Sequence, residues 1–218
     1  FPNAGLKAAR KRRFGEARLG DLLKPCVIPS YEIAQRRAVF FNSQDVRGPK
    51  AHKPNYYLRD IARATASAPT YFPASRLQLE GKDEQVLVDG GVFANNPALC
   101  AYAEVRTTNM QEELQDETVP SVATIKNMMI VSLGTGSTKK AYPWPKFKQA
   151  GALRWVKPVI DIMMSGNADT VHYQLRQIFD SQADEAISAN YYRLEPSKGE
   201  ADSDMALASQ ENMHRLKR

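Results

Sequence analysis

The chain is organised around one segment, Val86-Leu87-Val88-Asp89-Gly90-Gly91-Val92-Phe93-Ala94-Asn95-Asn96-Pro97. Its first three residues form a short apolar run of the kind that makes a buried strand. Two glycines follow, and they permit backbone angles and close approaches that a Cβ forbids. Asn96 and Pro97 then have the residue types of a helix cap and a first helical position. The segment therefore predicts a strand, a glycine turn and a helix start, in that order.

Asp89 occupies the carboxyl end of the predicted strand. In open α/β sheets, ligands and catalytic groups collect at the carboxyl ends of strands. Asp and Gly are also ordinary turn formers, so the same residues fit a solvated turn with no chemical role. Taken alone, this segment leaves both interpretations open.

Two further segments flank the strand and turn: Ile61-Ala62-Arg63-Ala64-Thr65-Ala66-Ser67-Ala68-Pro69-Thr70-Tyr71-Phe72-Pro73-Ala74 before it, and Ile130-Val131-Ser132-Leu133-Gly134-Thr135-Gly136-Ser137 after it. In this order the three segments resemble the patatin-like phospholipase family. The resemblance runs from about Leu19 to Leu216 and includes Asn190-Tyr191-Tyr192-Arg193-Leu194. We therefore expect an α/β fold, a three-layer α/β/α patatin-like sandwich with a mixed, mostly parallel central sheet.

The resemblance also implies a lipid acyl hydrolase, of phospholipase A or lysophospholipase type, that cleaves fatty-acyl esters through a Ser-Asp dyad. Asp89 stands at the position of the dyad aspartate. It would accept the proton of the serine, and the resulting acyl-enzyme would lose its fatty acid to water. Such a dyad needs no metal and no cofactor. The spacing of the histidines, His52, His172 and His214, does not indicate a metal site or a catalytic triad.

The nucleophile of the family is a serine in a Gly-x-Ser-x-Gly elbow, preceded by a glycine-rich loop that forms the oxyanion hole. No Gly-x-Ser-x-Gly occurs in these 218 residues. In the family both motifs precede the region matched here, so we expect residues 1–218 to be a single domain, the later part of a patatin-like catalytic domain whose N-terminal segment is missing. The fragment alone is then expected to be inactive.

Two alternatives accompany this hypothesis. Ser67 would be the nucleophile if the dyad assignment is wrong, but it has no elbow glycines, and we interpret it as a hydroxyl at a helix end. The competing class of function is a non-catalytic patatin-like module that lacks the nucleophile and binds lipid or a protein partner.

The net charge of +6 resides in the first 37 residues, where nine Lys and Arg residues face three acids, a surplus of six. Such a cluster fits peripheral contact with an anionic membrane, to which each basic residue adds about 1 kcal/mol. Lys11-Arg12-Arg13 would also contact the phosphates of a nucleic acid. No aromatic residues for base stacking are interleaved with these cations, so no nucleic-acid partner is expected. A solvated face is the remaining interpretation.

With 43% hydrophobic residues, the chain is long enough to bury one core. Its longest apolar run, around Met128 to Leu133, is far shorter than the roughly 18 residues of a spanning helix, so any membrane contact is expected to be peripheral. Cys26 and Cys100 are too few for a disulfide framework, and we interpret them as buried free thiols. They favour a reducing compartment, and we expect a cytoplasmic location.

The remaining pattern predicts further elements in chain order. They are strands at 26–33 and 38–42, a helix from Asn55 to Pro69, a helix at 97–105, a strand at 128–133, two consecutive helices within 153–179 interrupted at Ser165-Gly166-Asn167, a strand at 190–194 and a final helix capped by Ser203-Asp204. Residues 141–147, with Pro143-Trp144-Pro145, are expected to form neither a regular helix nor a central strand. They fit either an amphipathic flap over the site or a packed loop.

Overall fold

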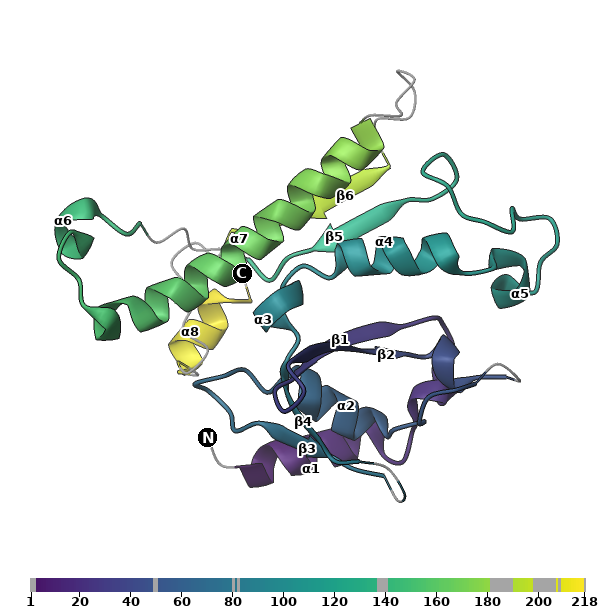
Figure 1. Cartoon of the computed structure of the whole chain (residues 1–218), viewed down its shortest axis with the longest axis horizontal. Helices are drawn as coiled ribbons and strands as arrows, with labels where there is room; N and C mark the ends of the chain where they lie inside the picture. The colour runs from purple at the N-terminus through teal and green to yellow at the C-terminus, as the bar shows by residue number, and fades with distance from the viewer. Residues whose placement is uncertain are drawn as a thin grey trace. The chain divides into compact units, whose positions relative to one another are not determined.

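The computed structural model describes residues 3–48, 51–79, 81, 83–136, 141–180, 190–197, 207 and 209–217. The chain divides into two compact units, Phe1–Cys100 and Ala101–Arg218, and each has its own arrangement of helices and strands (Figure 1). The expectation of a single domain over residues 1–218 stays a prediction.

A four-stranded sheet forms the centre of the first unit (Figure 1). Its strands are β1 (Val27–Glu32), β2 (Arg37–Asn42), β3 (Ser75–Leu77) and β4 (Gln85–Asp89), in the spatial order β2-β1-β4-β3. All three strand pairs are antiparallel. The predicted strands around Val27, Val39 and Val86 are thus confirmed.

Three helices accompany this sheet. They are α1 (Asn3–Phe14), α2 (Leu58–Thr65) and α3 (Gly91–Ala94), with short 3₁₀ turns η1 (Leu19–Asp21) and η2 (Gln44–Val46). Helix α2 packs against β1, β3 and β4, and α1 packs against α2. The buried core between them consists of Leu19, Phe41, Tyr56, Leu58, Ile61, Ala64, Leu77 and Leu87.

Helix α3 packs on the face of the sheet opposite to α2. The ring of Phe93 in α3 lies 5.7 Å from Phe40 of β2 and 6.0 Å from Tyr31 of β1, centroid to centroid. Successive residues of a strand point to opposite faces, and Phe41 belongs to the core beneath α2. Helices α2 and α3 therefore contact opposite faces of the sheet.

The second unit contains most of α4 (Ala98–Thr107), then α5 (Met110–Leu114), β5 (Ile130–Leu133), α6 (Trp144–Phe147), α7 (Ala152–Asp180), β6 (Tyr191–Leu194) and α8 (Gln210–Arg215). Strands β5 and β6 pair in parallel, and α7 packs on β6. Three buried residues of α7, Val171, Leu175 and Phe179, follow the i, i+4, i+8 spacing of one helix face, and Pro158 nearer the start of the helix is also buried.

The α/β class is confirmed, but the expectation of a mostly parallel sheet is wrong for the described strands. Three of the four strand pairs are antiparallel and one is parallel. The connections explain two of the three antiparallel pairs: only residues 33–36 join β1 to β2, and residues 78–84 join β3 to β4. Connections this short make hairpins, whereas a parallel pair needs a crossover of a dozen residues or more. The three-layer arrangement stays a prediction.

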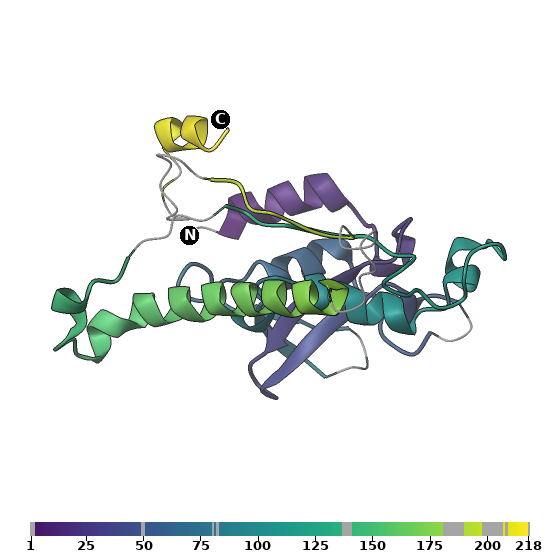
Figure 2. The same ribbon diagram turned by 90° about the horizontal axis from the view of Figure 1, so that it is seen from above.

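Residues 153–179 were expected to form two helices, and this prediction is wrong. Helix α7 is one continuous helix of 29 residues (Figure 2). A glycine within a helix costs only about 1 kcal/mol relative to alanine, which does not end a helix whose flanks are both helical. Two hydroxyls near Gly166 also bond to carbonyls four residues earlier in the helix. Ser165 donates to the carbonyl of Asp161 at 2.8 Å, and Thr170 donates to the carbonyl of Gly166 at 2.7 Å.

Two smaller predictions concern helix starts. Residues 141–147 were expected to contain no helix, yet Trp144–Phe147 forms a single turn, α6, because proline is tolerated in the first turn of a helix. The Ser203-Asp204 cap lies outside the described residues, and the described helix α8 is capped by Ser209, which accepts from the N–H of Asn212 at 3.2 Å. Within the described part of the chain, no helix has the length and apolar character needed to cross a membrane.

Candidate active site

Asp89 is the last residue of β4, as the sequence predicted. Its neighbour in the adjacent strand β1 is Ser30, whose hydroxyl donates to the carbonyl of Val88 at 2.7 Å. On another side, the backbone N–H of Asp89 donates to the carbonyl of Ser67, just beyond α2, at 3.1 Å. Backbone contacts from two elements therefore fix the position of the aspartate.

The carboxylate of Asp89 is half-buried. Its Oδ1 accepts a hydrogen bond of 2.7 Å from the backbone N–H of Gly91. Burial raises the pKa of Asp89 above its usual value, and the Gly91 hydrogen bond opposes that rise. In the described part of the chain, no other residue bonds to this carboxylate. The second oxygen, Oδ2, can therefore accept a proton from a group brought to it.

Gly90 is required by the close approach of β1 to the turn. A Cβ built on Gly90 would lie 2.6 Å from the carbonyl carbon of Pro29, a separation that side chains do not adopt. The carbonyl oxygen of Pro29 also accepts a hydrogen bond of 2.7 Å from Thr65 in α2. Strand β1, helix α2 and the turn after Asp89 thus meet at one backbone group, which leaves no space for a side chain at position 90.

Asn96 caps the helix that follows the turn. It is buried, and its side-chain oxygen accepts from the N–H of Ala98 at 3.2 Å, at the start of α4. The sequence predicted a helix cap from Asn96 and Pro97, and this prediction is confirmed. The turn after Asp89 is therefore held at its far end as well.

Ser67, the alternative nucleophile, is completely buried. Its hydroxyl donates to the carbonyl of Arg63 at 2.6 Å and accepts from the guanidinium of the same residue. This environment agrees with a structural hydroxyl at a helix end. A nucleophilic serine would need access to substrate, and the position of Ser67 does not give it.

The sequence did not indicate a positioning role for Arg63, which the structure places beside Ser67. Its side chain is buried, donates to the carbonyl of Pro73 at 2.8 Å, and lies 5.6 Å from the ring centroid of Phe72. Burial lowers the pKa of this guanidinium. The only signal in the sequence was an arginine in an otherwise small and apolar segment, four residues before a serine.

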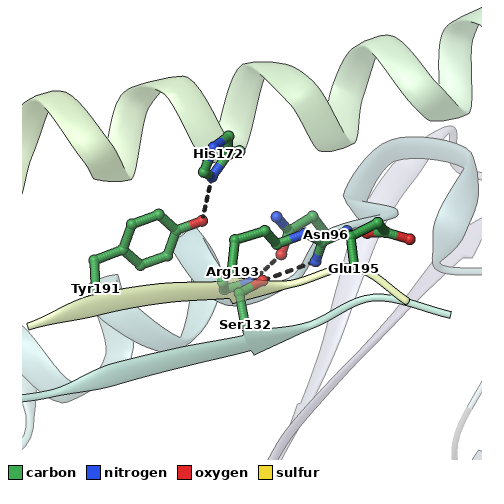
Figure 3. Close-up of polar contacts among 7 residues, drawn as sticks. Asn96, Ser132, His172, Tyr191, Arg193 and Glu195 are labelled. Carbon is green, nitrogen blue, oxygen red and sulfur yellow. Dashed lines mark hydrogen bonds and ion pairs between the residues drawn. The ribbon is translucent and has the colours of Figure 1, made fainter. Parts of the chain in front are cut away.

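A separate polar cluster lies in the second unit, where Figure 3 shows the residues of β5, β6 and α7. Nδ1 of His172 and the hydroxyl of Tyr191 are 3.0 Å apart. Arg193 donates to the hydroxyl of the buried Ser132 at 2.9 Å and forms an ion pair with Glu195. These contacts join the two parallel strands to each other and to the helix above them.

The described residues contain neither a metal-ligand cluster nor a disulfide. In the ranges that the structure describes, no three His, Cys, Asp or Glu side chains are grouped as metal ligands. Cys26 and Cys100 are free and half-buried, and burial raises the pKa of each thiol. The candidate site is therefore built from a carboxylate and backbone groups.

Comparison with known sequences identifies relatives of this chain. The patatin-like phospholipase family model matches residues 1–102, which include Asp89 and its turn. Over 231 aligned residues the chain is 32% identical to patatin-like protein 2 of Oryza sativa subsp. indica, covering 97% of this chain and 54% of that protein. It is also 32% identical to patatin-like protein 3 of Arabidopsis thaliana (93% and 49%) and 29% identical to patatin-like protein 1 of the same plant (98% and 53%). The chain spans about half the length of these curated relatives.

Proposed function

Because the chain belongs to the patatin-like phospholipase family, we propose that the protein hydrolyses fatty-acyl esters of phospholipids or related lipids, with Asp89 as its general base. One observation carries the proposal. The Asp89 carboxylate is half-buried at a strand end, with a raised pKa and one oxygen held by the Gly91 N–H. A carboxylate near its ordinary pKa of about 4 is a weak base, and partial desolvation makes it a stronger one.

In the proposed reaction, Oδ2 of Asp89 accepts the proton of a serine hydroxyl while the serine oxygen attacks the ester carbonyl. The tetrahedral intermediate expels the lipid alcohol, to which the protonated Asp89 returns the proton. Asp89 then takes a proton from the water that attacks the acyl-serine, and it returns this proton to the serine oxygen as the fatty acid leaves. The Gly91 N–H holds Oδ1 throughout, so the carboxylate keeps its orientation as its charge changes.

The proposal assigns the nucleophile to a serine outside these 218 residues. No Gly-x-Ser-x-Gly occurs among them, and the hydroxyl of Ser67 is buried against Arg63. A chain limited to these residues is accordingly expected not to hydrolyse even a short-chain ester, because it lacks both nucleophile and oxyanion donors.

Contact with the lipid surface belongs to the same proposal. The basic side chains of α1, Lys7, Arg10, Lys11, Arg12 and Arg13, lie on a helix that begins the first unit. We propose that they draw the enzyme to anionic membranes, where its acyl substrates are located, by long-range attraction that salt screens.

A covalent probe tests the chemistry directly. The whole protein is treated with a fluorophosphonate, which labels activated serines, and the labelled residue is identified by mass spectrometry. We expect a serine outside this chain to be labelled, and labelling to slow strongly in Asp89→Asn but not in Asp83→Asn, an exposed carboxylate of the same unit. Labelling of Ser67, or equal rates in both variants, would contradict the assignment. A fully unlabelled protein that still binds lipid would favour the non-catalytic module.

A further inference from the structure

A pocket of about 240 Å³ lies in the first unit and is formed by Lys7, Arg10, Lys11, Glu16, Arg59 and Asp60. Helix α1 supplies three of these residues, α2 supplies two, and Glu16 comes from the segment after α1. Four of the six side chains are cationic and two are anionic. The pocket is therefore positively charged, and none of its six residues takes part in the proton transfers proposed for Asp89.

Hydrogen bonds between the elements give the pocket a fixed frame. Arg10 donates to the carbonyl of Arg59 at 2.9 Å, which joins α1 to α2. Arg59 donates to the carbonyl of Gly15 at 2.6 Å and forms an ion pair of 2.6 Å with Glu16. The Arg59 hydrogen bond holds the pKa of Glu16 below its usual value, so this carboxylate is charged and already neutralised by its partner.

Lys7 and Lys11 are the cations that remain available. They are exposed, and within the described ranges neither forms an ion pair or a side-chain hydrogen bond. Because they are four residues apart on α1, with Arg10 between them at i+3, all three lie on one face of the helix. Arg59 is paired with Glu16, and Asp60 supplies the second negative charge of the lining, so the four cations leave a local surplus of two positive charges.

We propose that this pocket binds a phosphoryl group, held by the ammonium groups of Lys7 and Lys11 and by the frame that Arg10 and Arg59 provide. A phosphomonoester carries a charge of about −1.5 to −2 near neutral pH, which matches the surplus. The volume is below the 300 Å³ at which pockets for drug-sized ligands begin, so it suits a small polar group. The inference is independent of the proposed hydrolase activity.

A nucleic acid is the competing ligand for such a basic surface, and the neighbouring aromatic residue argues against it. The guanidinium groups of Arg18 and Arg59 lie 3.9 and 4.1 Å from the ring centroid of Tyr57. Two guanidinium groups already contact this ring, which makes it a poor platform for stacking a base.

Two double variants of α1 distinguish the contribution of the pocket residues to binding from that of the positive charge of the whole helix. Lys7→Ala/Lys11→Ala removes two cations that line the pocket. Arg12→Ala/Arg13→Ala removes the same charge from neighbouring exposed positions that do not line it. Thermal melts followed by circular dichroism establish that both are folded, which is expected because all four side chains are exposed.

Calorimetric titration of the whole protein with inorganic phosphate and with glycerol 3-phosphate then measures binding. We expect both ligands to bind, with affinity falling at least tenfold in Lys7→Ala/Lys11→Ala and no more than about twofold in Arg12→Ala/Arg13→Ala. Equal losses in the two variants, or no binding of either ligand at millimolar concentration, would overturn the proposal, as would tighter binding of a single-stranded oligonucleotide that is insensitive to the Lys7 and Lys11 changes.

Vesicles identify where the phosphoryl group comes from. At equal anionic charge, vesicles with phosphatidic acid expose a phosphomonoester and those with phosphatidylglycerol do not. Tighter binding to phosphatidic acid, lost in Lys7→Ala/Lys11→Ala, assigns the pocket to a lipid head group. If both kinds of vesicle bind equally, and free phosphate competes with glycerol 3-phosphate in the calorimeter, the pocket is assigned to a soluble phosphate. Either result supports the pocket.

Discussion

The backbone N–H of Asp89 donates to the carbonyl of Ser67 over 3.1 Å, and this bond ties the end of β4 to the end of α2. The bond uses no atom of the carboxylate. The position of Asp89 therefore depends on backbone groups, and its side chain can be changed without removing the contacts that hold it. This separation makes the proposed role of the carboxylate testable apart from folding.

The raised pKa of Asp89 predicts how its charge affects stability. An aspartate has a pKa of about 3.9 in an unfolded chain. Between that value and the raised folded pKa, the folded state binds more protons than the unfolded state, so the free energy of unfolding falls as pH rises through this window. Asp89→Asn, whose side-chain oxygen can still accept from Gly91, should thus be at least as stable as the wild type at pH 7.

Urea unfolding of both proteins at pH 7 and near pH 4 measures the effect, with Asp83→Asn as a control for net charge. The difference in free energy of unfolding that favours Asp89→Asn over the wild type should shrink as pH falls toward 4. An advantage that grows on acidification would show that the folded state lowers the pKa of this carboxylate.

Gly90→Ala should destabilise the first unit strongly, by more than about 2 kcal/mol, because its Cβ would meet backbone atoms of Pro29 that cannot move aside. Gly5→Ala in α1 is the matched control. Its Cβ meets nothing within 4 Å, and alanine favours a helix interior by up to about 1 kcal/mol. Chemical denaturation of the two variants should give changes of opposite sign, and similar small changes in both would refute the close approach at Gly90.

Ser67→Ala should lower the free energy of unfolding by about 1 to 3 kcal/mol, because the buried guanidinium of Arg63 loses an acceptor. Ser165→Ala in α7 is the control, since its hydroxyl also bonds to the carbonyl four residues before it but is exposed. That variant should change stability by less than about 0.5 kcal/mol. Equal effects in denaturant titrations would mean that burial of Ser67 contributes nothing.

Tyr191→Phe tests the polar cluster of the second unit. It removes the hydroxyl that lies 3.0 Å from Nδ1 of His172 and should cost about 0.5 to 1.5 kcal/mol. Tyr192→Phe makes the same change at the next residue, whose side chain is 42% exposed, and should be nearly neutral. Thermal unfolding of the pair gives the comparison, and a larger loss for Tyr192→Phe would contradict the packing of β6 described above.

Local patterns predicted the parts of the structure that depend on neighbours in the sequence. The apolar run before Asp89 gave its strand, and the residue types of Asn96 and Pro97 gave the cap of α4. The contacts of Pro29 with Gly90 and of Ser67 with Asp89 were not predictable in this way, because each joins positions more than twenty residues apart. The break expected at Gly166 was wrong since helical flanks outweigh one unfavourable residue.

The candidate site likewise has features that the local sequence predicts and features that depend on distant contacts. The position of Asp89 at a strand end is confirmed, and its role as general base stays a prediction. Lys7, Arg10 and Lys11 lie at a helical spacing that is visible in the sequence. Arg59, which completes their pocket, is 48 residues beyond Lys11 and is brought there only by the packing of α2 on α1.

Turnover of the whole protein on a phospholipid ester after Asp89→Asn shows whether this carboxylate acts as the general base. We expect a folded protein whose kcat falls by about 10² to 10⁴-fold, the usual contribution of a general base. Asp83→Asn, which makes the same chemical change at an exposed position of the first unit, should retain kcat within about twofold. A folded Asp89→Asn protein that turns over phospholipid at the wild-type rate would contradict the claim that this carboxylate takes the proton.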